Sequence, residues 1–164
     1  MSWLIESFDD FLNKKYTDIF VDFDQTLYLW DESQLKKDSL AEFYAKSIAM
    51  RDGSQYNPDQ INKILIKYLQ ESNAKVHLAT HVRISANAEA KFNFINKYYP
   101  NLLTDWFGLA NPESKILLLD AFVCNGYDKS EILMIDDNDT VIDCCKCGGF
   151  DVQNPQFIMG LYTD

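Results

Sequence analysis

The chain has 164 residues, of which 47% are hydrophobic and 24% are charged. These proportions predict a single globular domain over residues 1–164 with a sizeable core, and they argue against long disordered segments. The formal net charge is -10, from 15 Lys+Arg and 25 Asp+Glu. Extended nucleic-acid binding is therefore not expected, and any nucleic-acid contact would be confined to a local groove.

No apolar run approaches the roughly 20 residues that a membrane-spanning helix needs. The first fifteen residues, "MSWLIESFDDFLNKK", also carry acids where a signal peptide would be apolar. Three of the four cysteines crowd into "CCKCGG", a spacing that is not typical of a zinc site and favours small buried helix residues in a reducing compartment. The sequence thus predicts a soluble, cytoplasmic protein with no membrane partner.

The first half of the chain predicts three helices around one strand. We expect an amphipathic helix over 2–14, a hydrophobic strand over 18–23, a helical pattern over about 34–50, and a helix that begins at Pro58. The apolar face of the first helix is expected to pack on the core, or alternatively on a partner, and consists of Trp3, Leu4, Phe8, Phe11 and Leu12. The residues expected to face the core are Leu35, Leu40, Phe43, Tyr44 and Ile48 in the second helix, and Ile61, Ile64, Leu65, Tyr68 and Leu69 in the third.

The second half alternates strands and helices. Strands are expected over 75–80, 103–110, 131–136 and 150–154. The helix after the first of these strands is expected to bury Ile84, Ala88, Phe92 and Ile95. The next helix is expected to begin at an Asn111 cap with Pro112, and the last to begin near a capping Asp139. This alternation predicts an α/β fold: a three-layer, Rossmann-like parallel sheet of about five strands with helices on both faces.

Acidic residues follow two of the predicted strands. Asp22 and Asp24 end the first strand, Asp136 and Asp137 end the fourth, and Thr80 ends the second. Because ligands of such sheets bind beyond the carboxyl ends of the strands, we expect these side chains to converge. Four converging carboxylates would repel one another unless a cation neutralised them, and Mg²⁺ prefers such oxygen ligands. Either acidic pair alone could instead be a solvated loop or a helix cap.

Four segments carry a family resemblance. "IFVDFDQT" resembles the first motif of the haloacid dehalogenase (HAD) superfamily, and "VHLAT" resembles the second. Lys115 in "NPESK" matches the lysine of the third motif, and "ILMIDDNDTVIDCCKCGG" resembles the fourth. The motifs occur in family order from about residue 18 to residue 153, and the first and fourth are fairly specific.

The resemblance implies a role for each matched residue. Asp22 would be the nucleophile that forms an aspartyl-phosphate, and Asp24 would be the general acid and then the general base. Thr80 and Lys115 would hold the phosphoryl oxygens. Thr80 could instead cap the helix near Ile84, and Lys115 could be a solvated lysine in the first helical turn.

The same resemblance implies a Mg²⁺ site. Asp137 would bind the ion together with Asp22 and the backbone carbonyl of Asp24, and Asp136 would be a direct ligand or would support the others. Gln25 departs from the commonest family pattern, which has glycine there, and could change the local turn.

Several residues near the expected site are candidates for substrate contact. His81 follows Thr80 directly, and Tyr28, Trp30 and Arg83 are weaker candidates. The spacing between the motifs leaves room for at most a small helical cap insert around 34–57. A nearly open site suits a phosphate on a macromolecule, or a small substrate enclosed by a second subunit of a homo-oligomer.

The resulting expectation is a magnesium-dependent phosphatase, a phosphomonoester hydrolase that acts through an aspartyl-phosphate. Two alternatives stay open. The chain could be a non-catalytic phosphate-binding or interaction protein on the same scaffold, although the intact set of acids argues against it. It could also be a phosphotransferase, which differs only in the acceptor.

Overall fold

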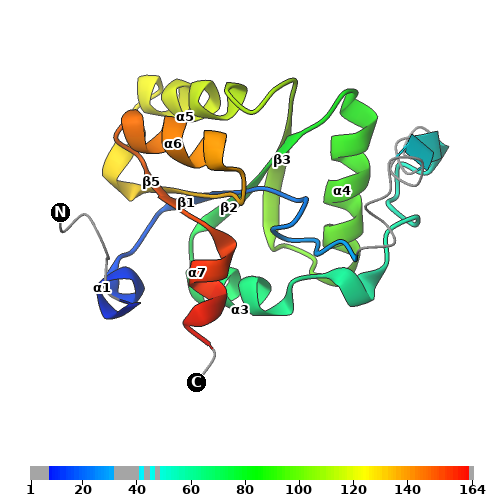
Figure 1. Cartoon of the computed structure of the whole chain (residues 1–164), viewed down its shortest axis with the longest axis horizontal. Helices are drawn as coiled ribbons and strands as arrows, with labels where there is room; N and C mark the ends of the chain where they lie inside the picture. The colour runs from blue at the N-terminus through cyan, green and yellow to red at the C-terminus, as the bar shows by residue number, and fades with distance from the viewer. Residues whose placement is uncertain (1–7, 32–40, 43–44, 47–48, 163–164) are drawn as a thin grey trace.

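The computed structural model describes residues 8–31, 41–42, 45–46 and 49–162. Its centre is a five-stranded, all-parallel sheet in the order β3-β2-β1-β4-β5 (Figure 1). The strands are β1 (Asp18–Val21), β2 (Lys75–His81), β3 (Leu103–Leu109), β4 (Ile132–Ile135) and β5 (Asp151–Gln153). The predicted α/β fold with a parallel sheet is confirmed.

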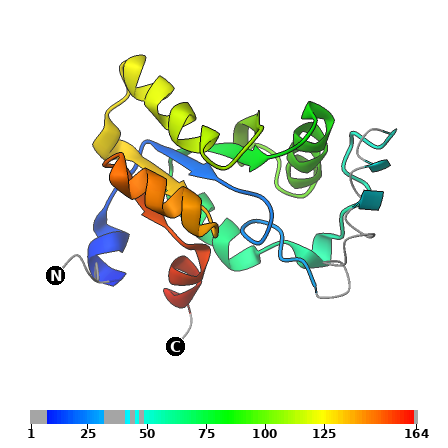
Figure 2. The ribbon, with the colours of Figure 1, turned by 45° about the horizontal axis from the view of Figure 1, so that its top comes forward.

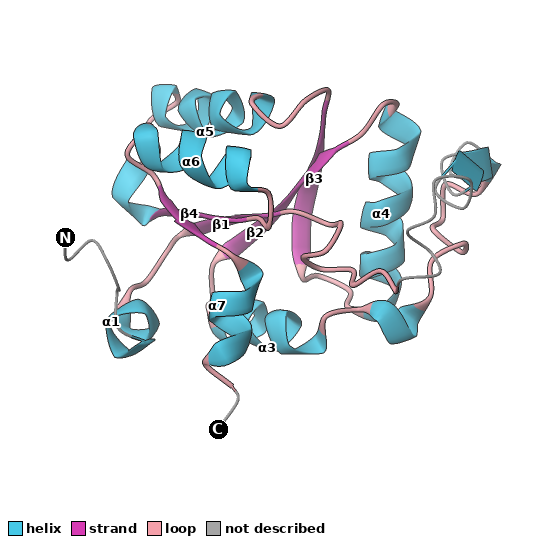
Figure 3. Cartoon of the chain, in the orientation of Figure 1, coloured by secondary structure: helices cyan, strands magenta, loops and turns pink. Residues whose placement is uncertain are grey.

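Helices cover both faces of the sheet (Figure 3). The helices are α1 (Phe8–Asn13), α3 (Lys63–Glu71), α4 (Ser85–Tyr98), α5 (Ser114–Cys124), α6 (Asp139–Cys147) and α7 (Pro155–Gly160). Helices α5 and α6 lie over one face, and residues of α1, α3, α4 and α7 share the core on the other (Figures 1 and 2). None of the helices in these described ranges is long and apolar enough to cross a membrane.

The central strands are mainly apolar because both of their faces are covered, although β1 begins with the buried Asp18. In β1, Ile19 and Val21 belong to the core on the α3 side, and Phe20 belongs to the core on the α5 side. Strand β4 alternates in the same way, and its four residues are all fully buried. Side chains of a strand alternate between faces, so a strand buried on both sides reads as a continuous hydrophobic run.

The N-terminal expectations are confirmed in part. Phe11 is buried and stacks on Tyr68, but Leu12 is 52% exposed, so its predicted place in the core is wrong. The rest of the predicted helix over 2–14, with Trp3 and Leu4, lies mainly outside the described residues. So do the expected core residues of the 34–50 helix. The described residues of that range are 41–42, 45–46, 49 and 50, and all of them except residue 50 are helical.

The helix predicted at Pro58 begins later. Residues Pro58–Gln60 form one 3-10 turn, and α3 begins only after Asn62, whose side chain accepts a hydrogen bond from the Leu65 N–H group. Ile66 rather than Ile64 is buried in α3. Asn62 also donates to the Thr26 carbonyl oxygen, so the cap ties α3 to the loop after β1.

The predicted inner face of α4 is wrong at two of its four positions. Ile84 precedes the helix and is 40% exposed, and Phe92 is only partly buried, whereas Ala88 and Ile95 are buried as expected. Phe94 instead packs among Phe23, Tyr28 and Tyr56. Lys91, one turn from both Ala88 and Ile95, is 1% exposed.

The C-terminal elements differ mostly at their ends. The Asn111 side chain accepts from the Ser114 N–H group, but α5 begins at Ser114, not at Pro112. Asn138 rather than Asp139 caps α6. Helix α7 was not predicted, although Asn154 and Pro155 begin it with the same kind of signal. Among the four cysteines only Cys145 is buried, so the expectation of buried helix cysteines holds for one of them.

Gly53 packs directly against α4. Its φ of +79° is rare for residues with a side chain, and a Cβ atom there would lie 2.4 Å from the Ala90 carbonyl oxygen and 2.6 Å from the Phe94 Cβ atom. The neighbours are backbone and the base of a side chain, so they cannot move aside easily. Gly53 thus permits the segment before α3 to dock on α4.

We expect Gly53→Ala to lower the free energy of unfolding by about 3 kcal/mol, because it combines a steric overlap with an unfavourable backbone conformation. Gly126→Ala is the matched control, since Gly126 also has a positive φ (+99°) but would place its Cβ in open space. The control should cost only about 1 to 2 kcal/mol. Urea unfolding measures both, and equal losses would contradict the proposed close packing.

Candidate active site

The chain leaves β1 through a tight turn that exposes its two acids to the same edge of the sheet. The Asp22 N–H group donates to the Ile135 carbonyl oxygen at 3.0 Å, which extends the β1–β4 pairing by one residue. The Tyr28 N–H group then donates to the Phe23 carbonyl oxygen at 2.9 Å. Gln25, inside this turn, has a φ of 55°, a conformation that glycine adopts more easily. The departure from glycine is therefore accommodated with some backbone strain.

Three of the expected carboxylates gather at the ends of β1 and β4. One oxygen each of Asp22, Asp136 and Asp137 lies within 4.8 Å of the others. Two hard oxygen donors, on Asp22 and Asp137, are well suited to a divalent cation. Asp136 is fully buried, and its two oxygens already accept from Lys115 and from the Asn138 N–H group. The residues fit a divalent cation, with Asp136 as a support that aligns the site.

Lys115 is the cation nearest to this cluster. It lies in the first turn of α5, is 3% exposed, and places its Nζ atom 3.0 Å from Asp22 Oδ1 and 2.5 Å from Asp136 Oδ2. Burial alone would lower the pKa of Lys115, but the two carboxylates outweigh burial and raise it. The lysine therefore stays charged and offsets one of the three negative charges.

The pKa values of two acids in the cluster are raised above their usual range. Burial, with help from the Asp136 and Asp24 charges, raises the pKa of Asp22 to about 6 despite the opposing effect of Lys115. Burial and the neighbouring Asp22 charge also raise the pKa of Asp137. The cluster thus carries more negative charge than Lys115 balances, which is the electrostatic condition for binding a cation.

Asp24 belongs to a separate arrangement. Its Oδ2 atom accepts from the Lys91 ammonium at 2.8 Å, and its Oδ1 atom accepts from the Trp30 indole N–H at 2.9 Å. Burial alone would raise the pKa of Asp24, but the Lys91 charge and these two hydrogen bonds lower it. The Asp24 carboxylate is therefore not among the three that gather at the cluster, and its backbone carbonyl stays a predicted metal ligand.

A cavity of about 230 Å³ opens over the acidic cluster. Its lining residues are Asp22, Asp24, Gln25, His81, Pro112, Lys115, Asp136, Asp137, Asn138 and Val141. His81 is exposed at its rim and bonds through Nε2 to the Ala110 carbonyl oxygen at 2.8 Å. The described residues of the 34–57 segment are not among this lining, so a cap over the site stays a prediction.

The other expected contacts lie farther from this cavity. Thr80 is fully buried and accepts from Lys91 at 3.0 Å, so its role in phosphate binding stays a prediction. Tyr28 lies in the core, and Arg83 is exposed. Sequence reasoning missed Lys91. The available signal was a lysine that shares one helix face with Ala88 and Ile95, both expected in the core.

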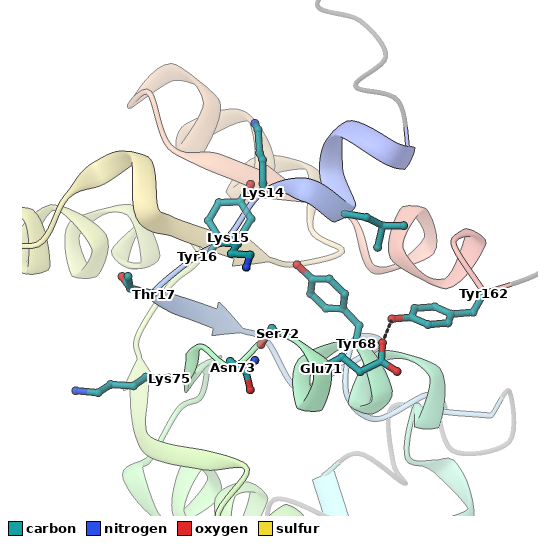
Figure 4. A pocket seen from close by; sticks show the side chains of 11 residues that line it. Lys14, Lys15, Tyr16, Thr17, Tyr68, Glu71, Ser72, Asn73, Lys75 and Tyr162 are labelled. Carbon is teal, nitrogen blue, oxygen red and sulfur yellow. Dashed lines mark hydrogen bonds between the residues drawn. The ribbon is translucent and has the colours of Figure 1, made fainter.

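A larger cavity, of about 610 Å³, lies at the amino ends of β1 and β2 (Figure 4). Lysine and tyrosine side chains line much of it, and the Tyr162 hydroxyl donates to Glu71 at 3.1 Å. The cavity contains none of the clustered acids. Since ligands of parallel sheets bind at the opposite, carboxyl edge, the smaller cavity is the candidate active site despite its size.

We expect Lys115→Met to destabilise the chain by about 3 kcal/mol at pH 8, because two buried carboxylates lose their shared cation. The loss should be smaller at pH 5, where protonation of the acids removes the repulsion. Lys146→Met, at an exposed lysine in α6, should change stability by less than about 0.5 kcal/mol. Chemical denaturation at both pH values provides the measurement. A loss that does not depend on pH would show that Lys115 acts only through packing.

Solved structures of other proteins share this fold. The Unknown transcript 4 protein of Saccharomyces cerevisiae matches with a TM-score of 0.54 at 11% identity, over 84% of this chain and 90% of that chain. A HAD family enzyme of Bacteroides thetaiotaomicron in a magnesium complex matches with a TM-score of 0.50 at 13% identity, over 87% of this chain and 94% of that chain.

A haloacid dehalogenase-like hydrolase of Streptococcus pneumoniae matches with a TM-score of 0.50 at 14% identity, over 91% of this chain and 92% of that chain. No family model matches the chain, and no curated protein sequence matches it. At these identities the comparison concerns the path of the chain and not its chemistry. The chain therefore has the α/β fold of the HAD hydrolases.

Proposed function

We propose that the chain is a HAD-type phosphatase, a phosphomonoester hydrolase that uses Mg²⁺ and an aspartyl-phosphate intermediate. The observation that carries the proposal is the position of Asp22. It ends the central strand of a HAD fold, lines the candidate cavity, and contacts Lys115 while sharing a cation-sized space with Asp136 and Asp137. A nucleophilic carboxylate needs this neighbourhood, because positive charge must offset the negative charge of the approaching phosphate.

The proposed reaction has two displacements. An Asp22 oxygen attacks phosphorus, the bond from phosphorus to the leaving oxygen breaks, and Asp24 gives its proton to that oxygen. Water then attacks the aspartyl-phosphate while Asp24 takes a proton from it, which releases inorganic phosphate and restores Asp22. The Lys91 ion pair favours the carboxylate form of Asp24, as the second step requires. A bound phosphoryl group would favour the protonated form for the first step.

The residues around the reacting group have distinct roles. Lys115 would hold a phosphoryl oxygen and keep Asp22 oriented, and Asp22 and Asp137 would supply the oxygen ligands of Mg²⁺, aligned by Asp136. When bound, Mg²⁺ supplies positive charge that offsets the charge on the transferring phosphoryl group. Thr80 would bind phosphate only if its hydroxyl, now buried beside Lys91, became accessible.

One observation supports a second candidate function. Thr80, the expected phosphate ligand, is fully buried, so this conformation suits binding at the acidic cluster more directly than turnover that needs the Thr80 hydroxyl. A non-catalytic phosphate-binding or interaction protein on the same scaffold would bind magnesium and phosphate but release no product. The mutation experiment below separates the two functions.

The proposed substrate is a phosphate monoester whose carrier can reach an open cavity. The fit is best for a phosphate on a macromolecule, because the described chain places no lid among the residues that line the cavity. A small phosphorylated molecule would need a second subunit or the 34–57 segment to enclose it. A screen of phosphorylated metabolites, phosphopeptides and oligonucleotides with terminal phosphates identifies the class.

We expect millimolar Mg²⁺ to raise the melting temperature, and to do so more at pH 7 than at pH 5. The raised pKa of Asp22, about 6 instead of 3.8, means that protons compete with the metal below pH 6. Without metal the sign reverses, because the folded chain then binds that proton more tightly than the unfolded chain does. The contribution of Asp22 to stability therefore falls as pH rises from about 4 to about 6.

Differential scanning fluorimetry with and without Mg²⁺ measures both effects. Asp137→Asn should remove most of the gain from Mg²⁺, whereas Asp143→Asn, in the same region but not in the cluster, should retain it. An equal gain at pH 5 and pH 7 in the wild type would place the metal elsewhere.

We expect Asp22→Asn to abolish turnover, with at least a 1000-fold loss of kcat, while the melting temperature is retained or raised. The amide keeps the shape of the carboxylate but loses the nucleophilic charge. Release of inorganic phosphate from the best substrate of the screen is the readout. If no phosphomonoester is turned over by the wild type while phosphate still binds, the non-catalytic alternative is the correct one.

A further inference from the structure

Lys91 has an environment that core packing alone does not explain. It lies in the middle of α4 on the face turned to the sheet and is 1% exposed. A buried ammonium without partners would cost several kcal/mol, so its contacts must be close to obligatory. Its Nζ atom donates to Asp24 at 2.8 Å and to Thr80 at 3.0 Å, and it lies 5.3 Å from the centre of the Phe23 ring.

These contacts join three elements at the edge of the candidate site. Asp24 follows β1, Thr80 belongs to the end of β2, and Lys91 belongs to the helix that comes next in the chain. Trp30 holds the other oxygen of Asp24. A carboxylate bound on both oxygens has one side-chain orientation, yet the Asp24 side chain is still 39% exposed and lines the cavity. Asp24 is thus fixed and accessible at once.

The two acids of the first motif are consequently divided between two buried lysines. Asp22 pairs with Lys115, and Asp24 pairs with Lys91. The two acids are only two residues apart, so an Asp24 carboxylate without its partners could turn toward the same cation as Asp22. The pairing with Lys91 and Trp30 instead keeps it out of the acidic cluster, which contains Asp22 but not the Asp24 side chain among the described residues.

We propose that Lys91 is a positioning residue, which holds the Asp24 side chain beside the leaving group of the substrate and away from the metal ligands. This inference rests on the proposed phosphatase function for the role of Asp24, but the placement itself is a structural claim. Trp30 assists from the exposed side. Lys91 does not touch the substrate, so it acts on the reaction only through Asp24, and its effect is expected to be largest where the leaving group also needs a proton from Asp24.

The test compares two substrates that differ in this need: p-nitrophenyl phosphate, whose leaving group departs without a proton, and an alkyl phosphate. In Lys91→Met, kcat should fall by about 100-fold on the alkyl phosphate, where both steps need Asp24, and by only about tenfold on p-nitrophenyl phosphate, where only the activation of water needs it. KM and the Mg²⁺ concentration for half-maximal activity should not change. Asp24→Asn should show the same pattern. Lys97→Met, at an exposed lysine of the same helix, is the matched control and should resemble the wild type.

Two outcomes would overturn the proposal: equal losses on both substrates, which indicate a purely structural lysine, and no loss on either. Trp30→Phe covers the case in which Lys91→Met does not fold, because it removes the second contact of Asp24 without leaving a buried charge. It should lower kcat more on the alkyl phosphate, by roughly three- to tenfold, than on p-nitrophenyl phosphate. Equal losses on the two substrates, or no loss on either, in Trp30→Phe would also contradict the placement.

A second measurement does not depend on activity. The Trp30 indole N–H resonance in NMR spectra reports its hydrogen bond to Asp24, and it should move in Lys91→Met and Asp24→Asn but not in Lys97→Met. If the wild type hydrolyses no phosphate ester while this resonance moves as expected, the phosphatase proposal fails and the placement of Asp24 holds. An unmoved resonance in folded Lys91→Met refutes the placement whatever the activity.

Discussion

Buried negative charge at the carboxyl edge of the sheet is the constraint on which the rest of the site depends. Asp22 and Asp136 have little contact with solvent, and each would be costly to bury alone. Lys115 lies between them, and Lys91 balances Asp24 nearby. Two lysines do not balance four carboxylates, and burial together with the neighbouring negative charges raises the pKa of Asp22 and Asp137. The fold thus stabilises the acids enough to assemble them and leaves an attraction for a cation.

The topology explains how distant segments reach this one edge. All five strands run in the same direction, so each leaves the sheet at the same side, and the chain must return along a helix before it adds the next strand. The two helices that begin at this edge after β2 and β3 therefore carry their N-terminal halves toward the acids. Helix α5 brings Lys115 in its first turn, and α4 brings Lys91 in its second. The parallel topology therefore places both lysines beside the acids whose charge they offset.

Sequence patterns predicted the parts of the site that depend on short-range order. An apolar run that ends in acids identifies a buried strand and its end, so Asp22 and Asp136 could be placed from sequence. The phase of α4 could not, because its weak amphipathic pattern allowed two faces, and packing of Phe94 with Tyr28 and Tyr56 selects one. Lys91 was missed because a lysine is usually solvated, although Lys91 shares a helix face with Ala88 and Ile95, which were expected in the core. Helix α7 could have been predicted from the sequence, since Asn154 and Pro155 are typical of a helix start.

The central position of β1 also has a consequence for synthesis on the ribosome. Strand β1 can pair with β2 once residue 78 has emerged, but its other edge pairs with residues 132–135 and stays open until they follow. An apolar strand with free backbone groups can recruit other nascent chains into aggregates. Asp18 is the first residue of this strand, Asp22 and Asp24 follow the strand, and their like charges oppose such pairing between copies. The acids proposed for catalysis in the folded protein would thus also oppose aggregation while the chain is still being synthesised.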